Sequence, residues 1–107
     1  MSEFRSEKLN ELFMHCSAEF VALNSNRTSL ITVTNFVLSD DEKRATIFVT
    51  VLPTDKEKGA LEFLKRQRPE LREFIKKKVR TRVIPFVDFA IDNGEKNRQK
   101  IDLLSLN

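Results

Sequence analysis

Basic side chains gather in one short stretch of this chain, and they are its clearest chemical signal. The 18 residues from 65 to 82 hold nine lysines and arginines and only two glutamates, which gives this stretch a net charge of +7. The other 89 residues have a net charge of −4. A basic segment on an otherwise acidic chain is typical of proteins that neutralise nucleic-acid phosphates. The candidate phosphate-binding residues are Lys65, Arg66, Arg68, Arg72, Lys76, Lys77, Lys78, Arg80 and Arg82.

Helical spacing should bring three of these side chains together. On a helix that begins at Pro69, Arg72, Lys76 and Arg80 recur every fourth residue and share a face. The preceding break would add free helix N–H groups beside the cations at 65–68, which suits a phosphate. Charge reversal at the three residues should weaken nucleic-acid binding and leave the fold intact. The simpler interpretation is a solvated basic face without a partner, but the acidic remainder of the chain favours phosphate binding.

The other reactive residue types form no catalytic or metal-binding set. The acidic cluster at 40–42 falls in an expected hairpin turn, and Asp88 and Asp92 have no accompanying histidine, glycine-rich loop or nucleophile. His15 is the single histidine and is expected on an exposed helix face. Cys16 is the single cysteine and is expected to be buried, so no disulfide within the chain and no cysteine-pair zinc site can form. We therefore predict that the protein is not an enzyme and needs no cofactor or metal.

The composition suits one compact domain over residues 1–107. Hydrophobic residues make up 40% of the chain, and its aromatic residues are nine Phe with no Trp or Tyr, which fill a core without a polar partner. No stretch approaches the roughly 18 uncharged apolar residues of a membrane span, and the first residues do not resemble a signal or transit segment. These features predict a cytoplasmic protein, and we expect it to be a monomer.

The first half of the chain predicts a helix and a hairpin. From Glu7 to Leu23 the apolar residues follow a helical stripe that should end at the Asn-Ser-Asn turn. Two β-rich runs, at 30–38 and 44–52, flank a polar turn and indicate an antiparallel β-hairpin. Most Phe residues occupy core positions, but the pattern leaves the burial of Phe4 and Phe36 open.

The second half predicts two helices joined by a break. Thr54 and Glu57 have the spacing of a capping box, in which each side chain would satisfy a free amide of the helix start. Pro69 cannot continue a helix from within, so the chain should break near 67–68 and begin a second helix at the proline.

A third strand and a tail complete the predicted fold. The alternation at 83–91 indicates a strand, and Pro85 within it implies an edge strand, a bulge or the start of the strand. Residues 100–107 carry enough leucine and isoleucine to predict a packed terminal segment. The fold class is therefore α+β, in the order α-β-β-α-kink-α-β, with helices on one face of a three-stranded sheet.

Two stretches resemble the ribosome-binding factor A family. The first, residues 77–93, has the pair Arg80-x-Arg82, two β-branched residues, Pro85, an alternation with Phe and a closing Asp92. The second is the strand-like run 47–52, and the likeness extends over roughly residues 4–104. The resemblance implies a type II KH-like domain whose kinked helix pair contacts RNA. The Gly-x-x-Gly clamp of ordinary KH domains is missing, which favours recognition of folded RNA by shape and backbone.

The resemblance also implies a role in ribosome biogenesis. It predicts binding to the small (30S) ribosomal subunit and its 16S rRNA, help with late maturation and rRNA processing, and a greater requirement in the cold, with no membrane or DNA partner. One alternative is a KH-like protein-interaction or ribosome-silencing module whose basic face docks an acidic partner. A weaker alternative is a general RNA chaperone.

Overall fold

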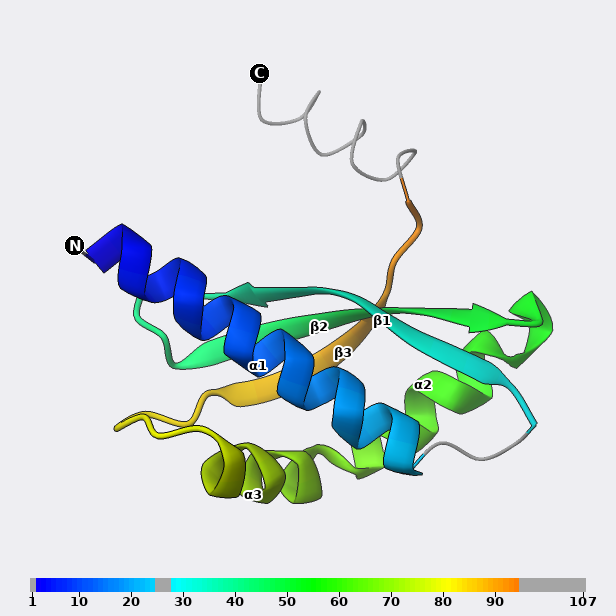
Figure 1. Cartoon of the computed structure of the whole chain (residues 1–107). Helices are drawn as coiled ribbons and strands as arrows, with labels where there is room; N and C mark the ends of the chain where they lie inside the picture. Colours follow the sequence, from blue (N-terminus) through cyan, green and yellow to red (C-terminus); the bar gives the residue numbers. More distant parts are fainter. Residues whose placement is uncertain (1, 25–27, 95–107) are drawn as a thin grey trace.

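The computed structural model describes residues 2–24 and 28–94 and shows helices packed on a three-stranded sheet (Figure 1). Thr54–Lys56 form one turn of 3-10 helix ahead of the second α-helix. The elements, in chain order, are α1 (Ser2–Asn24), β1 (Leu30–Leu38), β2 (Arg44–Leu52), α2 (Glu57–Arg66), α3 (Arg68–Lys78) and β3 (Phe86–Ile91). The predicted order of elements and the α+β class are confirmed.

The sheet has the strand order β1-β2-β3, with β2 in the centre. β1 and β2 form the predicted antiparallel hairpin, and a bulge lies between Val33 and Asn35. β3 pairs with β2 in parallel, with Phe86 opposite Arg44 and Ala90 opposite Phe48. Pro85 thus lies just before an edge strand, where its missing N–H costs the sheet no hydrogen bond.

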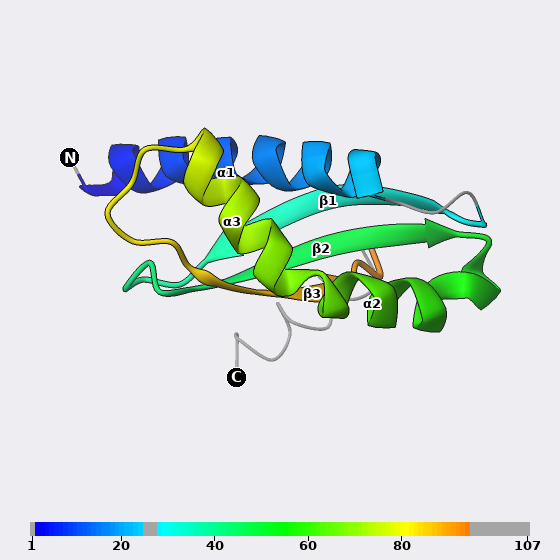
Figure 2. The same ribbon diagram turned by 90° about the horizontal axis from the view of Figure 1, so that it is seen from below.

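The helices cover one face of the sheet, as the sequence predicted. Every second residue of β2, from Ala45 to Val51, is buried, whereas the residues between them are half-exposed on the opposite face. Figure 2 shows α1 next to α3, and α2 beside β3, in agreement with the contacts between these elements.

One hydrophobic core joins the helices to the sheet. The Phe13 and Phe36 rings pack with their centroids 5.5 Å apart. Phe36 is fully buried, which answers the question of its burial that the sequence pattern left open. Leu71 and Ile75 bury the inner face of α3. For residues 2–6 the structure describes the backbone alone, so the burial of Phe4 is not tested, and the tail at 100–107 lies outside the described residues.

Three local predictions were wrong. No capping box forms, because the Lys56 N–H donates to the Pro53 carbonyl at 3.0 Å and a backbone bond closes this turn instead of a side chain. α3 begins at Arg68, one residue before the proline, although the break at Gln67 lies where the sequence predicted it. β3 begins at Phe86 rather than three residues earlier, because residues 79–85 form a loop.

Candidate nucleic-acid interface

The basic stretch forms the end of α2, the outer face of α3 and the loop that follows it. Val79 ends α3 by turning into an extended conformation, and its N–H donates to the Ile75 carbonyl at 2.8 Å. Arg80 therefore lies beyond the helix. The prediction that it shares a helical face with Arg72 and Lys76 is wrong.

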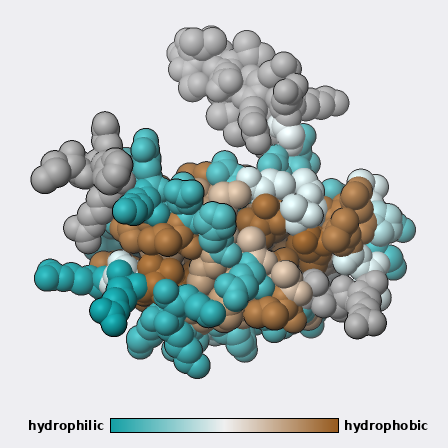
Figure 3. Space-filling model, viewed as in Figure 1, coloured by the Kyte–Doolittle hydropathy of each residue, from teal (hydrophilic) through white to brown (hydrophobic). Residues whose placement is uncertain are grey.

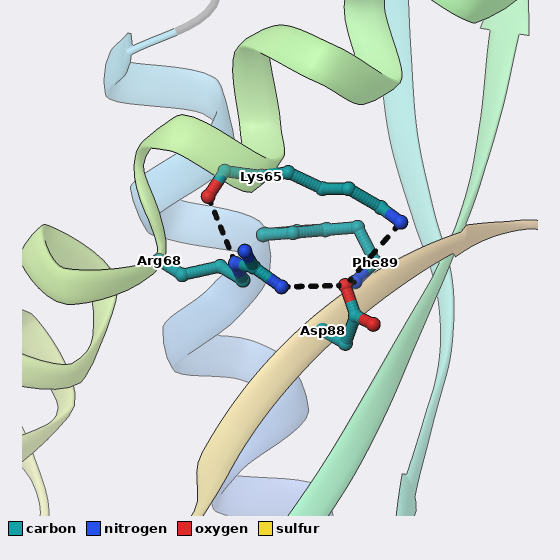
Figure 4. A network of polar contacts seen from close by, with 4 residues as sticks. All are labelled: Lys65, Arg68, Asp88 and Phe89. Atoms are coloured by element: carbon teal, nitrogen blue, oxygen red, sulfur yellow. Dashed lines mark hydrogen bonds and ion pairs between the residues drawn. The ribbon is translucent and has the colours of Figure 1, made fainter.

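Two of the nine predicted cations are held by one carboxylate (Figure 4). Asp88 Oδ1 accepts a hydrogen bond from Arg68 at 3.2 Å and lies 3.7 Å from the Lys65 ammonium. Arg68 Nε also donates to the Lys65 carbonyl at 2.9 Å. This cluster links the break between α2 and α3 to β3. It also places negative charge at the junction where the sequence suggested a phosphate site.

Arg72 is engaged by the loop after α3. Its guanidinium donates to the carbonyls of Ile84 and Pro85, at 3.0 and 3.2 Å, and lies 4.2 Å from the centre of the Phe86 ring. These contacts fix the loop against the helix and use donors that a phosphate would need. Reversing the charge of Arg72 would disturb this loop, contrary to the expectation that the fold would stay intact.

We expect Arg72→Lys to lower the free energy of unfolding by about 2 kcal/mol, because lysine keeps the charge but cannot make both carbonyl bonds and the ring stack. Urea denaturation measures this loss. Arg80→Lys is the matched control, since Arg80 is exposed and should tolerate the exchange. Equal stability of the two variants would contradict the structural role of Arg72.

Lys78 is also paired, on the flank of α3 that faces α1. Its ammonium lies 3.6 Å from a carboxylate oxygen of Glu19 and 5.4 Å from the Phe74 ring centre. Nearby, Glu70, Glu73 and Lys77 line a hollow between the two helices together with Phe20 and Phe74. This flank is therefore partly acidic and suits a phosphate backbone less well than the rest of the basic stretch.

The remaining five cations have no ion pair or hydrogen bond among the described residues, and all five are exposed. Figure 3 shows hydrophilic side chains gathered over α3 and the loop that follows it. We call these residues the free basic set. They are Arg66, Lys76, Lys77, Arg80 and Arg82. The lysines in the last turn of α3 also stabilise the helix through its dipole, but that contribution is only about 0.3–1 kcal/mol. The dipole does not account for the exposed arginines in the loop.

The parallel pairing of β2 and β3 brings together two residues that the sequence analysis did not combine. Arg44 begins β2 and lies directly opposite Phe86, the first residue of β3, and both side chains are exposed. No local pattern reveals this neighbourhood, because the two residues are 42 positions apart.

The single histidine and cysteine lie on α1 and are not part of the free basic set. His15 is exposed and lies 4.0 Å from Glu11, while Cys16 is 5% exposed, so both predicted placements are confirmed. Within residues 2–24 and 28–94, no three His, Cys, Asp or Glu side chains are placed to hold a metal ion. Among the described helices, none has the length and apolar character needed to cross a membrane.

Burial raises the pKa of the Cys16 thiol from 9.0 to about 11, with a smaller contribution from the Glu19 carboxylate. We therefore expect iodoacetamide at pH 8 to alkylate the folded protein at least about a hundredfold more slowly than the denatured chain, since the thiolate is the nucleophile. Because the folded pKa is raised, this group stabilises the fold below about pH 9, and the contribution is lost as the pH rises through about 11. Fast labelling of the folded protein at pH 8 would contradict the burial.

The fold and the site together define a class of small KH-like α+β domains. Their exposed cations, which have no partner among the described residues, lie at the end of α2, on α3 and in the loop after it. Comparison with known proteins narrows this class to one family. The family model described as ribosome-binding factor A matches residues 5–105. The chain therefore belongs to the ribosome-binding factor A family, and the resemblance noted in the sequence is confirmed.

Individual relatives support the assignment. Ribosome-binding factor A of Thermodesulfovibrio yellowstonii is 31% identical over 102 residues, which cover 94% of this chain and 86% of that protein. The crystal structure of the Thermus thermophilus factor has a TM-score of 0.72 and 26% identity, and covers 79% of this chain and 93% of that one. A model of the T. thermophilus factor fitted into a cryo-EM map of a 30S–RbfA complex is similar at 25% identity and a TM-score of 0.72, covering 81% and 94%.

Proposed function

We propose that this protein is a non-catalytic assembly factor that binds the small ribosomal subunit through 16S rRNA. The observation that carries the proposal is the free basic set, five exposed cations at the end of α2, on α3 and in the loop after it. They have no ion pair or hydrogen bond within residues 2–24 and 28–94. Cations left unpaired by their own protein are available to neutralise phosphates. The homology model of the T. thermophilus factor that was fitted into the map of a 30S–RbfA complex supports the same partner.

The proposed mode of recognition is contact with folded RNA through its backbone. The two glycines, Gly59 and Gly94, are too far apart in sequence for a Gly-x-x-Gly clamp. Phosphate contacts of this kind position a protein on RNA and carry little sequence information. Shape then supplies most of the specificity for the subunit.

The biological role we propose follows the family. The protein would act as a monomer in the cytoplasm, bind during late maturation, assist processing of precursor 16S rRNA, and be needed most in the cold. Its action is to hold an RNA conformation, so no bond is made or broken by the protein itself.

Cosedimentation with purified ribosomal particles tests the proposal. The protein should pellet with free 30S subunits at low salt, much less with 50S subunits or assembled 70S ribosomes, and should dissociate as salt is raised. Equal binding to all three particles would indicate a general RNA chaperone. Failure to bind any particle at low salt, together with capture by an acidic protein, would favour a protein-interaction module and overturn the proposal.

A further inference from the structure

Phe86 is an exposed aromatic ring that the structure holds in place. The residue is 66% exposed, yet its N–H donates to the Lys43 carbonyl at 2.8 Å and one face of its ring is covered by the Arg72 guanidinium. Arg72 is itself fixed by the carbonyls of Ile84 and Pro85. Fixing an exposed phenylalanine in one position usually adds little to the stability of the fold. A ring that is held in place and still has an accessible surface therefore indicates a contact surface for a flat partner.

The surroundings of this ring are cationic. Arg44 lies opposite Phe86 in the parallel pairing and is exposed, and residues directly opposite each other project from the same face of a sheet. Arg82, which is exposed and belongs to the free basic set, stands four residues earlier on the loop that leads into β3. The ring thus lies between a strand arginine and the loop of the proposed RNA interface.

The acidic groups near the ring are partly engaged by the protein. Asp88, two residues along β3, is held by Arg68 and Lys65. In the hairpin turn, Asp41 accepts hydrogen bonds from the Ser39 hydroxyl and the Lys43 N–H, which lower the pKa of its carboxyl below 3.8. Asp40, in the same turn, is exposed. The negative charge therefore lies mainly at the hairpin tip, while the strand residue beside the ring is an arginine.

We propose that Phe86 is a stacking platform for one unpaired RNA base, with the adjoining phosphates contacted by Arg44 and Arg82. A base stacked on the exposed ring surface would complete a guanidinium–phenyl–base stack, an arrangement that uses the π faces of both rings and the charge of Arg72. The proposal deepens the proposed function and rests on it, because it names the feature of the RNA that this edge of the interface would recognise. An unpaired base is the fitting partner, since bases inside a helix do not expose their faces.

The lack of tryptophan and tyrosine in this chain allows a direct test. Phe86→Trp introduces the sole strong fluorophore at the platform, and Leu23→Trp introduces it at a control site of similar exposure, 68%, at the end of α1. The probes are a single-stranded decaadenylate and an abasic ribose-phosphate decamer of equal charge. The adenylate should quench Phe86→Trp and bind it roughly tenfold to a hundredfold more tightly than the abasic strand does. It should leave the fluorescence of Leu23→Trp nearly unchanged.

A second variant separates this inference from the proposed function. Phe86→Leu should still cosediment with 30S subunits, but with affinity lowered roughly tenfold or more relative to the unchanged protein. If the unchanged protein binds 30S subunits and Phe86→Leu binds equally well, the platform is wrong and the function stands. If Phe86→Leu loses affinity while the adenylate and the abasic strand quench Phe86→Trp alike, Phe86 contacts ribosomal protein and the inference is overturned. Failure of the unchanged protein to bind any subunit overturns the proposed function instead.

Discussion

Replacing Lys76, Lys77 and Arg80 with glutamine should lower the affinity for 30S subunits by roughly a hundredfold at about 0.1 M salt. Each phosphate contact contributes roughly 0.7 to 0.9 to the slope of log K against log salt, so three lost contacts should flatten that slope by about 2 to 3. The three side chains are exposed and have no ion pair or hydrogen bond within the described part of the chain, so the fold should be unaffected. Binding titrations at several salt concentrations give both quantities.

The matched control removes equal charge from other parts of the surface. Lys8, Lys56 and Lys58 are exposed on α1, the 3-10 turn and the start of α2, and their replacement with glutamine should change the salt slope only slightly. If the control triple loses as much affinity as the first, net charge rather than the free basic set governs binding. An unchanged salt slope in the variant of Lys76, Lys77 and Arg80 would show that the RNA interface lies on another part of the protein.

Phe36→Ala should lower the free energy of unfolding by about 3–5 kcal/mol. Phe36 is fully buried on β1 and packs on Phe13, so truncation removes apolar contacts and leaves a cavity between α1 and the sheet. A loss of this size is a large fraction of the roughly 5–15 kcal/mol that stabilises a typical domain. Urea denaturation followed by circular dichroism measures it.

The same substitution at an exposed position provides the control. Phe86→Ala removes a ring that is 66% exposed and stacks on one guanidinium, so it should cost less than about 1 kcal/mol. Similar losses for the two alanine variants would show that the core is not organised around the Phe13–Phe36 pair.

The elements that depend on local sequence were predictable from it. The bounds of β1 and β2 agree with the β-rich runs on either side of the polar turn, because each strand is flanked by residues that favour turns. Pro69 correctly marked the break between α2 and α3. The start of β3 was placed too early, since the extended residues after Val79 look like a strand in sequence but have no partner strand until Phe86.

The sequence could not predict which of the basic residues are engaged by other parts of the protein. Helical periodicity grouped Arg72 with Lys76, but the carbonyls that bind Arg72 belong to a loop 12 and 13 residues away, and only the folded chain brings them together. The same holds for Asp88, which engages Lys65 and Arg68 from another element. Charge counting predicted the region, and the tertiary contacts show which of its cations have no partner among the described residues.

Directed hydroxyl-radical probing tests the central claim most directly, namely that the free basic set faces small-subunit RNA. Buried Cys16 should resist modification, so an iron chelate can be tethered selectively to Lys77→Cys on α3 or to Leu30→Cys at the start of β1, where the native leucine is 63% exposed. In complexes with 30S subunits, we expect strong, localised 16S rRNA cleavage from position 77 and weak cleavage from position 30. Weak cleavage from 77 together with strong cleavage from 30 would contradict the account.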